Sequence, residues 1–247
     1  MQTIVSRASE GMRRLPEGDL IMNVNRRSFL VGGASAAALA AFSLGGASTA
    51  LGSASVSPAV ALRRLERGNT RAANGRTVQR NYSPLGNTPG KGQEPFAAIV
   101  TCSDSRTVPD AMFDMAPGNL FVVRNAGNSI ESVGLGSLEF AAAVLGVSLI
   151  AVIGHTECGA VIATEDSVKT GELPPPSIDS VVEAIAPAVR PLPASATTND
   201  AIAANARYQA QQIQNSSSTL AEMTAAGTLG IVSGVFGVAS GRVTWLP

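Results

Sequence analysis

Three apolar runs, each followed directly by polar residues, constrain the fold of this 247-residue chain more than any other feature. The runs are FAAIVT before Cys102, NLFVV before Arg124 and SLIAVIG before His155. Continuous apolar runs of this length are typical of strands that are buried on both faces of a sheet. Helical patterns accompany them at 133–145, 178–189 and 200–216. Strands that alternate with helices predict an α/β fold with a mostly parallel central β-sheet flanked by helices.

Both ends of this region extend the pattern. The C-terminal stretch TLGIVSGVFGVASGRVTWL predicts a further strand, a turn at Ser240-Gly241 and a short return strand. Residues 57–75 have a helical pattern with arginines on the outer face. Residues 86–95 are rich in Gly and Pro, which indicates a loop.

The composition restricts the class of partner. Lys and Arg together number 18, as do Asp and Glu, so the formal net charge is zero, and hydrophobic residues make up 45% of the chain. This is the composition of a globular protein. A nucleic-acid-binding protein needs a basic surface for phosphates or aromatic side chains for stacking, and aromatic residues are only 4% here. We therefore expect no nucleic-acid partner.

The first 55 residues form a separate segment. No charged residue occurs from Ser28 to Leu62, and the sequence NRRSFLVGG at 25–33 resembles a twin-arginine export signal. A membrane anchor is the alternative, because the apolar run is long enough to span a bilayer, but its Gly and Ser content makes it a poor spanning helix. We therefore expect an N-terminal extension with a twin-arginine-type signal at 1–55 and a folded domain at 56–247.

Export would place the protein in the periplasm, the cell envelope or the extracellular space, with no stable membrane insertion after the signal is removed. Met22 is an alternative start, because residues 1–21 precede the usual beginning of such a signal. Small residues between Ala47 and Ala54 offer several cleavage points. The start and the cleavage point therefore stay open.

Cys102, His155 and Cys158 are the two cysteines and the only histidine of the chain. Cys102 and His155 end two predicted strands, and the carboxyl ends of parallel strands meet at one edge of a sheet. Cys158 falls in the first turn of the helix expected after His155, and residues three apart share a helix face. Two cysteines and one histidine form a catalytic zinc set with an open fourth position, so we predict a Zn²⁺ site. The alternative is a Cys102–Cys158 disulfide, which is common in exported proteins.

The segment CSDSR places an acid beside this site. Asp104 lies two residues after Cys102, and positions two apart along an extended segment point to one face. Arg106 is placed to pair with Asp104 and keep it ionised. The alternative is that Asp104 only caps a helix or a turn.

The motifs CSDSR, PGNLFVVRNAGN and GHTECGA, in this order, resemble those of the β-class carbonic anhydrases. The resemblance runs from about Gly68 to the C-terminus and implies that 56–247 is a catalytic domain. The ligands and catalytic residues that it implies are Cys102, His155 and Cys158 for zinc, with Asp104 and Arg106 as the catalytic pair.

The same resemblance implies two residues that bind the substrate, CO₂ or bicarbonate. One is Gly159, through its backbone N–H, and the other is Gln93, which lies nine residues before Cys102 as in some members of the family. An amide at that place can donate to a substrate oxygen. The basic unit of the family is a dimer, so a homodimer or a larger homo-oligomer is implied.

The reaction implied is the zinc-dependent reversible hydration of CO₂ to bicarbonate and a proton, in which zinc-bound water provides hydroxide near neutral pH. Two alternatives stay open. A hydrolase of the same fold that acts on CS₂ or COS would share every ligand. A non-catalytic zinc-binding protein would leave Asp104, Arg106 and Gln93 without a role. In some family members the Asp itself binds zinc and closes the site, and the sequence does not decide between the open and closed forms.

Overall fold

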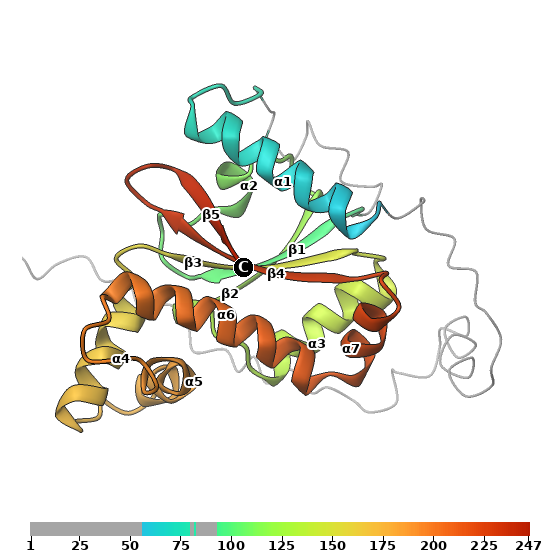
Figure 1. Cartoon of the computed structure of the whole chain (residues 1–247). Coiled ribbons are helices and arrows are strands. Elements are labelled where there is room, and N and C mark those ends of the chain that lie inside the picture. Colours follow the sequence, from blue (N-terminus) through green and yellow to red (C-terminus); the bar gives the residue numbers. More distant parts are fainter. Residues whose placement is uncertain (1–55, 80–81, 83–92) are drawn as a thin grey trace, which may run out of the picture. The chain divides into compact units, whose positions relative to one another are not determined.

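A five-stranded sheet with the strand order β2-β1-β3-β4-β5 lies at the centre of the computed structural model (Figure 1). The structure describes residues 56–79, 82 and 93–247, so the expected signal at 1–55, with Arg26 and Arg27, and most of the loop expected at 86–95 lie outside the described residues. Four strands are parallel, namely β1 (Ala97–Cys102), β2 (Leu120–Asn125), β3 (Leu149–His155) and β4 (Gly230–Gly237). Strand β5 (Arg242–Leu246) pairs antiparallel with β4. The predicted α/β fold with a mostly parallel sheet is confirmed.

The helices follow the predicted patterns with local differences. Helices α1 (Pro58–Ala73), α5 (Asp179–Val189) and α6 (Thr198–Ser216) lie where the periodicity predicts them. The helix expected at 133–145 is α3 (Ser132–Glu139) followed by a π-helical turn, η3 (Phe140–Val144). Helices α2 (Pro109–Met112) and α7 (Ser218–Ala225) were too short to show a clear period in the sequence. None of the described helices is long and apolar enough to cross a membrane.

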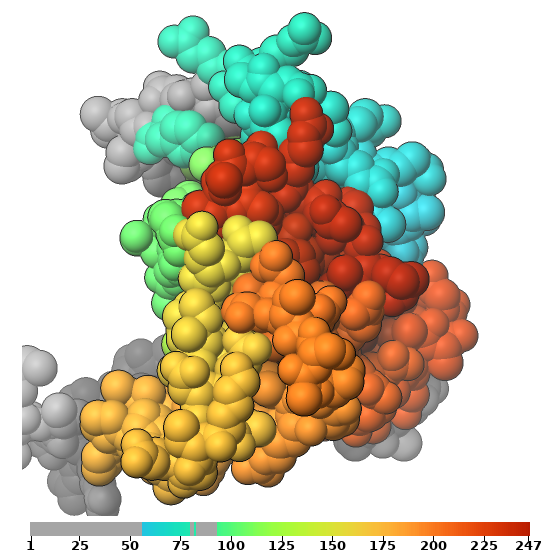
Figure 2. Space-filling view, turned by 60° about the vertical axis from the view of Figure 1, so that its left-hand side comes forward, coloured from blue at the N-terminus to red at the C-terminus, as the bar shows by residue number. Residues whose placement is uncertain are grey.

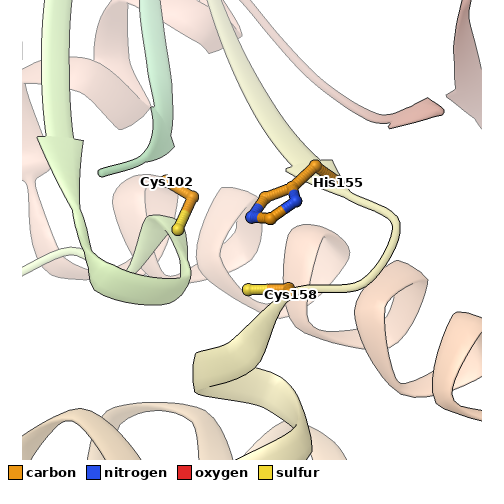
Figure 3. A group of neighbouring side chains, drawn as sticks. All are labelled: Cys102, His155 and Cys158. Carbon is orange, nitrogen blue, oxygen red and sulfur yellow. The ribbon is translucent and has the colours of Figure 1, made fainter. Parts of the chain in front are cut away.

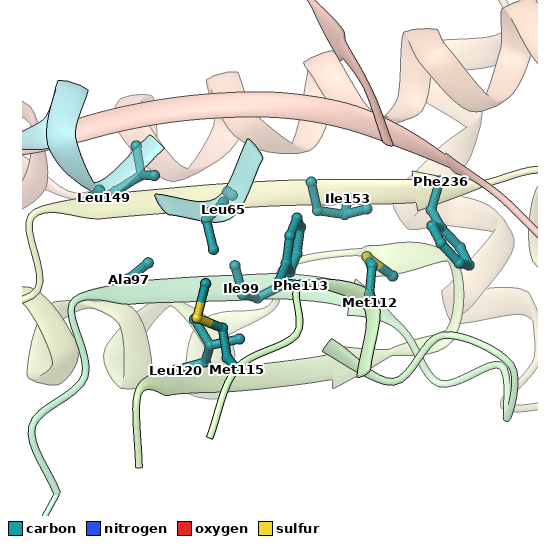
Figure 4. Close-up of a cluster of buried hydrophobic side chains, with 12 residues drawn as sticks. Leu65, Ala97, Ile99, Met112, Phe113, Met115, Leu120, Leu149, Ile153 and Phe236 are labelled. Atoms are coloured by element: carbon teal, nitrogen blue, oxygen red, sulfur yellow. The ribbon is translucent and has the colours of Figure 1, made fainter. Parts of the chain in front are cut away.

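Successive side chains of β1 alternate between two packed faces of the sheet. On one face, Ile99 belongs to a cluster with Leu65 of α1 and Phe113 at the end of α2 (Figure 4). On the other face, Val100 belongs to a cluster with Leu138 of α3 and residues of α6 and α7. Burying each such large apolar side chain contributes about 1.5–3 kcal/mol to stability. Helices therefore cover both faces, as a parallel sheet requires.

Asn69 fastens α1 to α2 and to the β4–β5 hairpin. Its Nδ2 donates to the backbone oxygens of Met112 at 3.0 Å and Gly241 at 2.8 Å, and its Oδ1 accepts from the backbone N–H of Val243 at 2.8 Å. In the space-filling view, α1 lies against this hairpin (Figure 2). The buried amide is thus well satisfied, and it holds α1 on the face of the sheet opposite to α6.

A third apolar cluster closes the carboxyl edge of the sheet, where β1 and β3 end. Cys102 and Cys158 are part of this cluster, together with Ile185 of α5 and Ile202 of α6. Helix α4 (Gly159–Thr170) begins there, directly after Cys158. The reactive residues that the sequence places at the strand ends therefore lie in largely apolar, buried surroundings.

Candidate metal centre

The structure brings Cys102, His155 and Cys158 together. One potential ligand atom from each residue lies within 4.8 Å of the other two, and all three residues are buried. Both cysteines are free thiols, so the structure does not contain the alternative disulfide. Figure 3 shows the two sulfur atoms and the imidazole ring turned toward a common space, between the ends of β1 and β3 and the start of α4. Thiolate and imidazole donors gathered in this way are typical ligands of zinc.

A tight turn, rather than a shared helix face, brings Cys158 to His155. His155 is the last residue of β3, and Cys158 is the residue that precedes the first turn of α4. Between them, Glu157 has a φ of 61°, a left-handed conformation that reverses the chain. Thr156 ties this turn to the end of β4 through two hydrogen bonds. Its backbone N–H donates to the backbone oxygen of Phe236 at 3.0 Å, and its Oγ1 accepts from the backbone N–H of Val238 at 3.0 Å. The predicted convergence is confirmed, but the helical reason for it is wrong.

The imidazole of His155 is oriented for one further bond. Its Nδ1 lies 2.9 Å from the backbone oxygen of Thr156, and because a carbonyl can only accept, Nδ1 carries the proton. Its Nε2 is buried and has no hydrogen-bond partner among the described residues, and the whole side chain is 0% exposed. The backbone carbonyl fixes one ring nitrogen, and the lone pair of the other faces the two sulfur atoms. This is the usual arrangement of a histidine that binds a metal.

Cys102 is prepared to ionise. Its Sγ accepts hydrogen bonds from the backbone N–H groups of Asp104 at 3.4 Å and Gly127 at 3.3 Å. The Cys158 thiol, the His155 imidazole and these N–H donors together outweigh the effect of burial and lower the pKa of Cys102 to about 3. The interaction with Cys102, followed by burial, raises the pKa of Cys158 above its usual value. Cys102 is thus the thiol that ionises more readily, and a divalent cation bound between the two sulfur atoms would favour the ionised form of both.

Asp104 and Arg106 form the pair that the sequence predicts. Arg106 donates from Nε to Oδ1 at 3.0 Å and from Nη2 to Oδ2 at 2.9 Å, which is a bidentate contact. These bonds, with one from the Arg106 backbone N–H, hold the pKa of Asp104 well below its usual range. Oδ2 of Asp104 also lies 4.0 Å from Nε2 of His155, so the carboxylate is close to the cluster. Asp104 therefore both caps a turn and pairs with Arg106.

Two residues that the sequence analysis did not assign to the site support this pair. Oε2 of Glu157 lies 2.9 Å from Nη1 of Arg106, so the guanidinium joins two carboxylates. Arg124, in β2, donates to the backbone oxygens of Cys102 at 3.1 Å and Asp104 at 2.7 Å. Arg124 could have been found, because it follows an apolar run as Cys102 and His155 do. No pattern marks Glu157, because its contact depends on the left-handed turn.

The two predicted substrate-binding residues are placed differently. Gly159 opens α4, and apart from its chain neighbours and the backbone of its own helix no atom lies within 4 Å of the place where a Cβ would stand. Its N–H is the first of a helix and has no acceptor within that helix, so it can serve a ligand. Gln93 is exposed and lies four residues before β1, at the end of the strand opposite to Cys102. Because a strand of this length spans about 20 Å, Gln93 does not join the cluster within one chain, and its role stays a prediction.

Comparison with known proteins places this geometry in a family. A family model described as carbonic anhydrase matches residues 97–243, which include the whole Cys-His-Cys cluster. The carbonic anhydrase of Mycolicibacterium smegmatis is 38% identical over 156 residues, which are 62% of this chain and 75% of the relative. Carbonic anhydrase 2 of Mycobacterium tuberculosis is 35% identical over 194 residues, which are 75% of this chain and 91% of the relative.

A solved structure shows the same fold. One of two tetrameric β-carbonic anhydrases from Sordaria macrospora has the same fold, with a TM-score of 0.55, 20% identity, and coverage of 76% of this chain and 94% of the other. The chain belongs to the β-class carbonic anhydrase family.

The donor set of this carbonic anhydrase fits a catalytic zinc ion. Two sulfurs and one imidazole nitrogen are the three protein ligands that such a site needs, whereas a structural zinc site takes a fourth. The chain contains no further Cys or His to supply one. A bound dication would give the unpartnered Nε2 of His155 a partner and would stabilise the two buried sulfur atoms beside it. The cluster thus suits zinc by the chemistry of its atoms as well as by family.

Proposed function

We propose that this chain catalyses the reversible hydration of CO₂ to bicarbonate and a proton, with Zn²⁺ held by Cys102, His155 and Cys158. The buried Cys-His-Cys cluster, with Oδ2 of Asp104 4.0 Å from the unpartnered Nε2 of His155, carries this proposal. The names of the related proteins support the same reaction.

Zinc bound at this cluster supplies a Lewis acid, which lowers the pKa of a water molecule and so provides a nucleophile near neutral pH. The protein side chains then decide how that nucleophile is used. Asp104 stays ionised because Arg106 lowers its pKa, and an ionised carboxylate can only accept hydrogen bonds. Its Oδ2 therefore orients the O–H of the attacking water, and leaves the oxygen lone pair free for CO₂.

Two further groups complete the site. The bidentate contact with Arg106 engages both carboxylate oxygens of Asp104, which supports the open form of the site over the form closed by Asp104. The N–H of Gly159 can donate to a substrate oxygen as charge develops on it. No residue of the described chain favours CS₂ or COS over CO₂.

The test is stopped-flow CO₂ hydration with the zinc-loaded full chain, followed by a pH indicator. We expect hydration well above the buffer rate, its loss on removal of zinc by a chelator, and its return when zinc is restored. COS and CS₂ serve as comparison substrates. A zinc-loaded chain that does not accelerate CO₂ hydration, or that turns over COS or CS₂ faster than CO₂, would contradict the proposal.

We also propose that the active form is a homodimer or a larger homo-oligomer. Strand β2 is at the edge of the sheet, and an unpaired edge is a ready surface for another strand. If a second copy pairs antiparallel along β2, its strands run opposite to those of the first copy. The start of its β1 then lies at the same edge of the joint sheet as Cys102 of the first copy. Gln93 of that second copy would then approach the Cys102 edge, which its own chain does not allow. The tetrameric state named for the Sordaria macrospora protein supports this proposal.

We further propose export by a twin-arginine-type route. The pair Arg26-Arg27 before a long uncharged run supports it. Unfolded cysteines in an oxidising compartment are exposed to disulfide formation. A route that carries folded protein would let Cys102 and Cys158 bind zinc before export.

A further inference from the structure

Cys102 receives one of its two backbone hydrogen bonds from a distant segment. The Asp104 N–H belongs to the chain that continues directly from Cys102. The Gly127 N–H, at 3.3 Å from Sγ, comes from the short helical turn η2 (Ala126–Asn128) after β2. An N–H···S bond removes charge from the sulfur, so its presence changes what the thiolate offers a metal. The position of Gly127 therefore matters to the metal centre.

The backbone at Gly127 is in an uncommon conformation. Gly127 has a φ of 66° and Asn128 a φ of 49°, so two successive residues are left-handed. A Cβ at position 127 would lie 2.4 Å from Cδ1 of Ile185, and L side chains rarely adopt this φ, so glycine is strongly favoured here. A segment in this conformation needs contacts from its surroundings to keep it.

Two amide side chains of α6, Asn205 and Gln209, supply these contacts. Nδ2 of Asn205 donates to the backbone oxygen of Gly127 at 2.8 Å. Oε1 of Gln209 accepts from the backbone N–H of Ile130 at 3.0 Å. The helix thus holds the segment from Gly127 to Ile130 at both ends.

The two amides are also tied to each other and to α5. Nε2 of Gln209 donates to Oδ1 of Asn205 at 3.1 Å and to the backbone oxygen of Ala184 at 2.9 Å. Asn205 is 1% exposed and Gln209 is 2% exposed. A buried amide costs free energy unless it is hydrogen-bonded, so this pair is fixed in one arrangement. It therefore holds Gly127 more firmly than a solvent-exposed contact would.

We propose that Asn205 and Gln209 are positioning residues of the metal centre, which fix the segment 127–130 so that the Gly127 N–H points at the Cys102 sulfur. This inference rests on the zinc site of the proposed function. Neither residue touches the metal ligands through its side chain. Their effect reaches the metal through one backbone hydrogen bond, and losing such an outer contact typically lowers metal affinity by about 10–100-fold.

The chain offers a matched control in Asn69. Like Asn205, it is a buried asparagine whose amide both donates and accepts. It donates to two backbone oxygens and accepts from one backbone N–H, and so fastens α1 to α2 and to the β4–β5 hairpin. Asn69→Leu and Asn205→Leu both remove a buried amide of the same size. We expect both to lower the thermal midpoint, because each leaves backbone groups without a partner. Only Asn205→Leu should change the metal centre.

The probe is the cadmium ion, bound to the full chain and observed by ¹¹³Cd NMR, with zinc affinity measured by chelator competition. We expect Asn205→Leu to move the ¹¹³Cd resonance and to weaken zinc binding by about 10–100-fold, with both values unchanged in Asn69→Leu. Gln209→Met keeps the length of the side chain and should give a smaller change in the same direction; it replaces Asn205→Leu if that variant does not fold. Wild-type values in the folded Asn205 or Gln209 variant would overturn the inference, and so would equal changes in the Asn69 control. Neither readout requires CO₂ hydration. A failure of this inference can therefore be told apart from a failure of the proposed reaction.

Discussion

The guanidinium of Arg106 joins two carboxylates, Asp104 and Glu157, and these two contacts differ in what they do. The bond to Asp104 controls the protonation and direction of a group close to the metal cluster. The bond to Glu157 lies at the surface, because the Glu157 side chain is 69% exposed. Surface ion pairs contribute only about 0–1 kcal/mol. At the scale of residues, the two carboxylates should therefore be separable by mutation.

Asp104→Ala should keep zinc and lower kcat/KM for CO₂ hydration by about 10–100-fold, because the reacting water loses its acceptor. Glu157→Gln should keep zinc and change kcat/KM by less than about fivefold, which is the effect of 1 kcal/mol. The measurements are stopped-flow hydration and zinc content per chain. Full activity in Asp104→Ala would refute the orienting role of this carboxylate, and a larger loss in Glu157→Gln than in Asp104→Ala would reverse the assignment.

At the scale of elements, α6 carries Asn205 and Gln209 and begins with a capping box. The backbone N–H of Asp200 donates to Oγ1 of Thr197 at 3.2 Å, and the Thr197 backbone N–H donates to Oδ2 of Asp200 at 2.8 Å. Hydrogen bonds from the Thr197 side chain and then its backbone lower the pKa of Asp200. A carboxyl with a lowered folded pKa stabilises the fold above its unfolded pKa of about 3.9, and this contribution is lost as the pH falls through the folded value.

Thr197→Ala should therefore lower the free energy of unfolding by about 1 kcal/mol at pH 7. The difference from wild type should shrink as the pH falls below about 4, because Asp200 then loses the charge that the cap uses. Urea unfolding of the full chain at a series of pH values measures both effects. A difference that is absent at pH 7, or that grows in acid, would show that the cap does not stabilise α6 in this way.

The sequence allowed the strands and long helices to be predicted because their hydrophobic period is clear. Cys102, His155 and Cys158 could be predicted as a cluster because these residue types are rare in the chain and two of them follow buried strands. Asn205 and Gln209 could not be predicted, because an amide in a helix looks the same in sequence whether it faces water or the core. The turn at Glu157 was also beyond prediction, since its left-handed conformation depends on the contacts of Thr156 with the end of β4.

At the scale of the whole molecule, the proposed oligomer can be tested by mixing two variants. A Gln93→Ala chain keeps its zinc ligands, and a Cys158→Ser chain lacks one but keeps Gln93. If Gln93 serves the site of the neighbouring copy, a purified heterodimer of the two contains one complete site and should recover about half of wild-type activity. The two homodimers are the controls. A heterodimer no more active than the mean of these controls would contradict the exchange of Gln93 between copies.

The proposed export also has a control within the chain, because Arg13-Arg14 is a second arginine pair. Changing Arg26 and Arg27 to Lys should retain active enzyme in the cytoplasm, whereas the same change at Arg13 and Arg14 should not. Cell fractionation with a CO₂ hydration assay of each fraction gives the result. Unchanged export of the Arg26/Arg27 variant, or loss of export from the Arg13/Arg14 variant, would count against the signal assigned here.

The central claim is that Cys102, His155 and Cys158 together bind a catalytic zinc ion, and zinc X-ray absorption spectroscopy of the full chain tests it most directly. We predict one zinc per chain with two sulfur neighbours at about 2.3 Å, one imidazole nitrogen at about 2.0–2.1 Å and one further light atom. Cys158→Ser should lose zinc or one of its sulfur neighbours, because a neutral hydroxyl replaces thiolate poorly. A wild-type spectrum with no sulfur neighbours, with four of them, or unchanged in Cys158→Ser would contradict the claim.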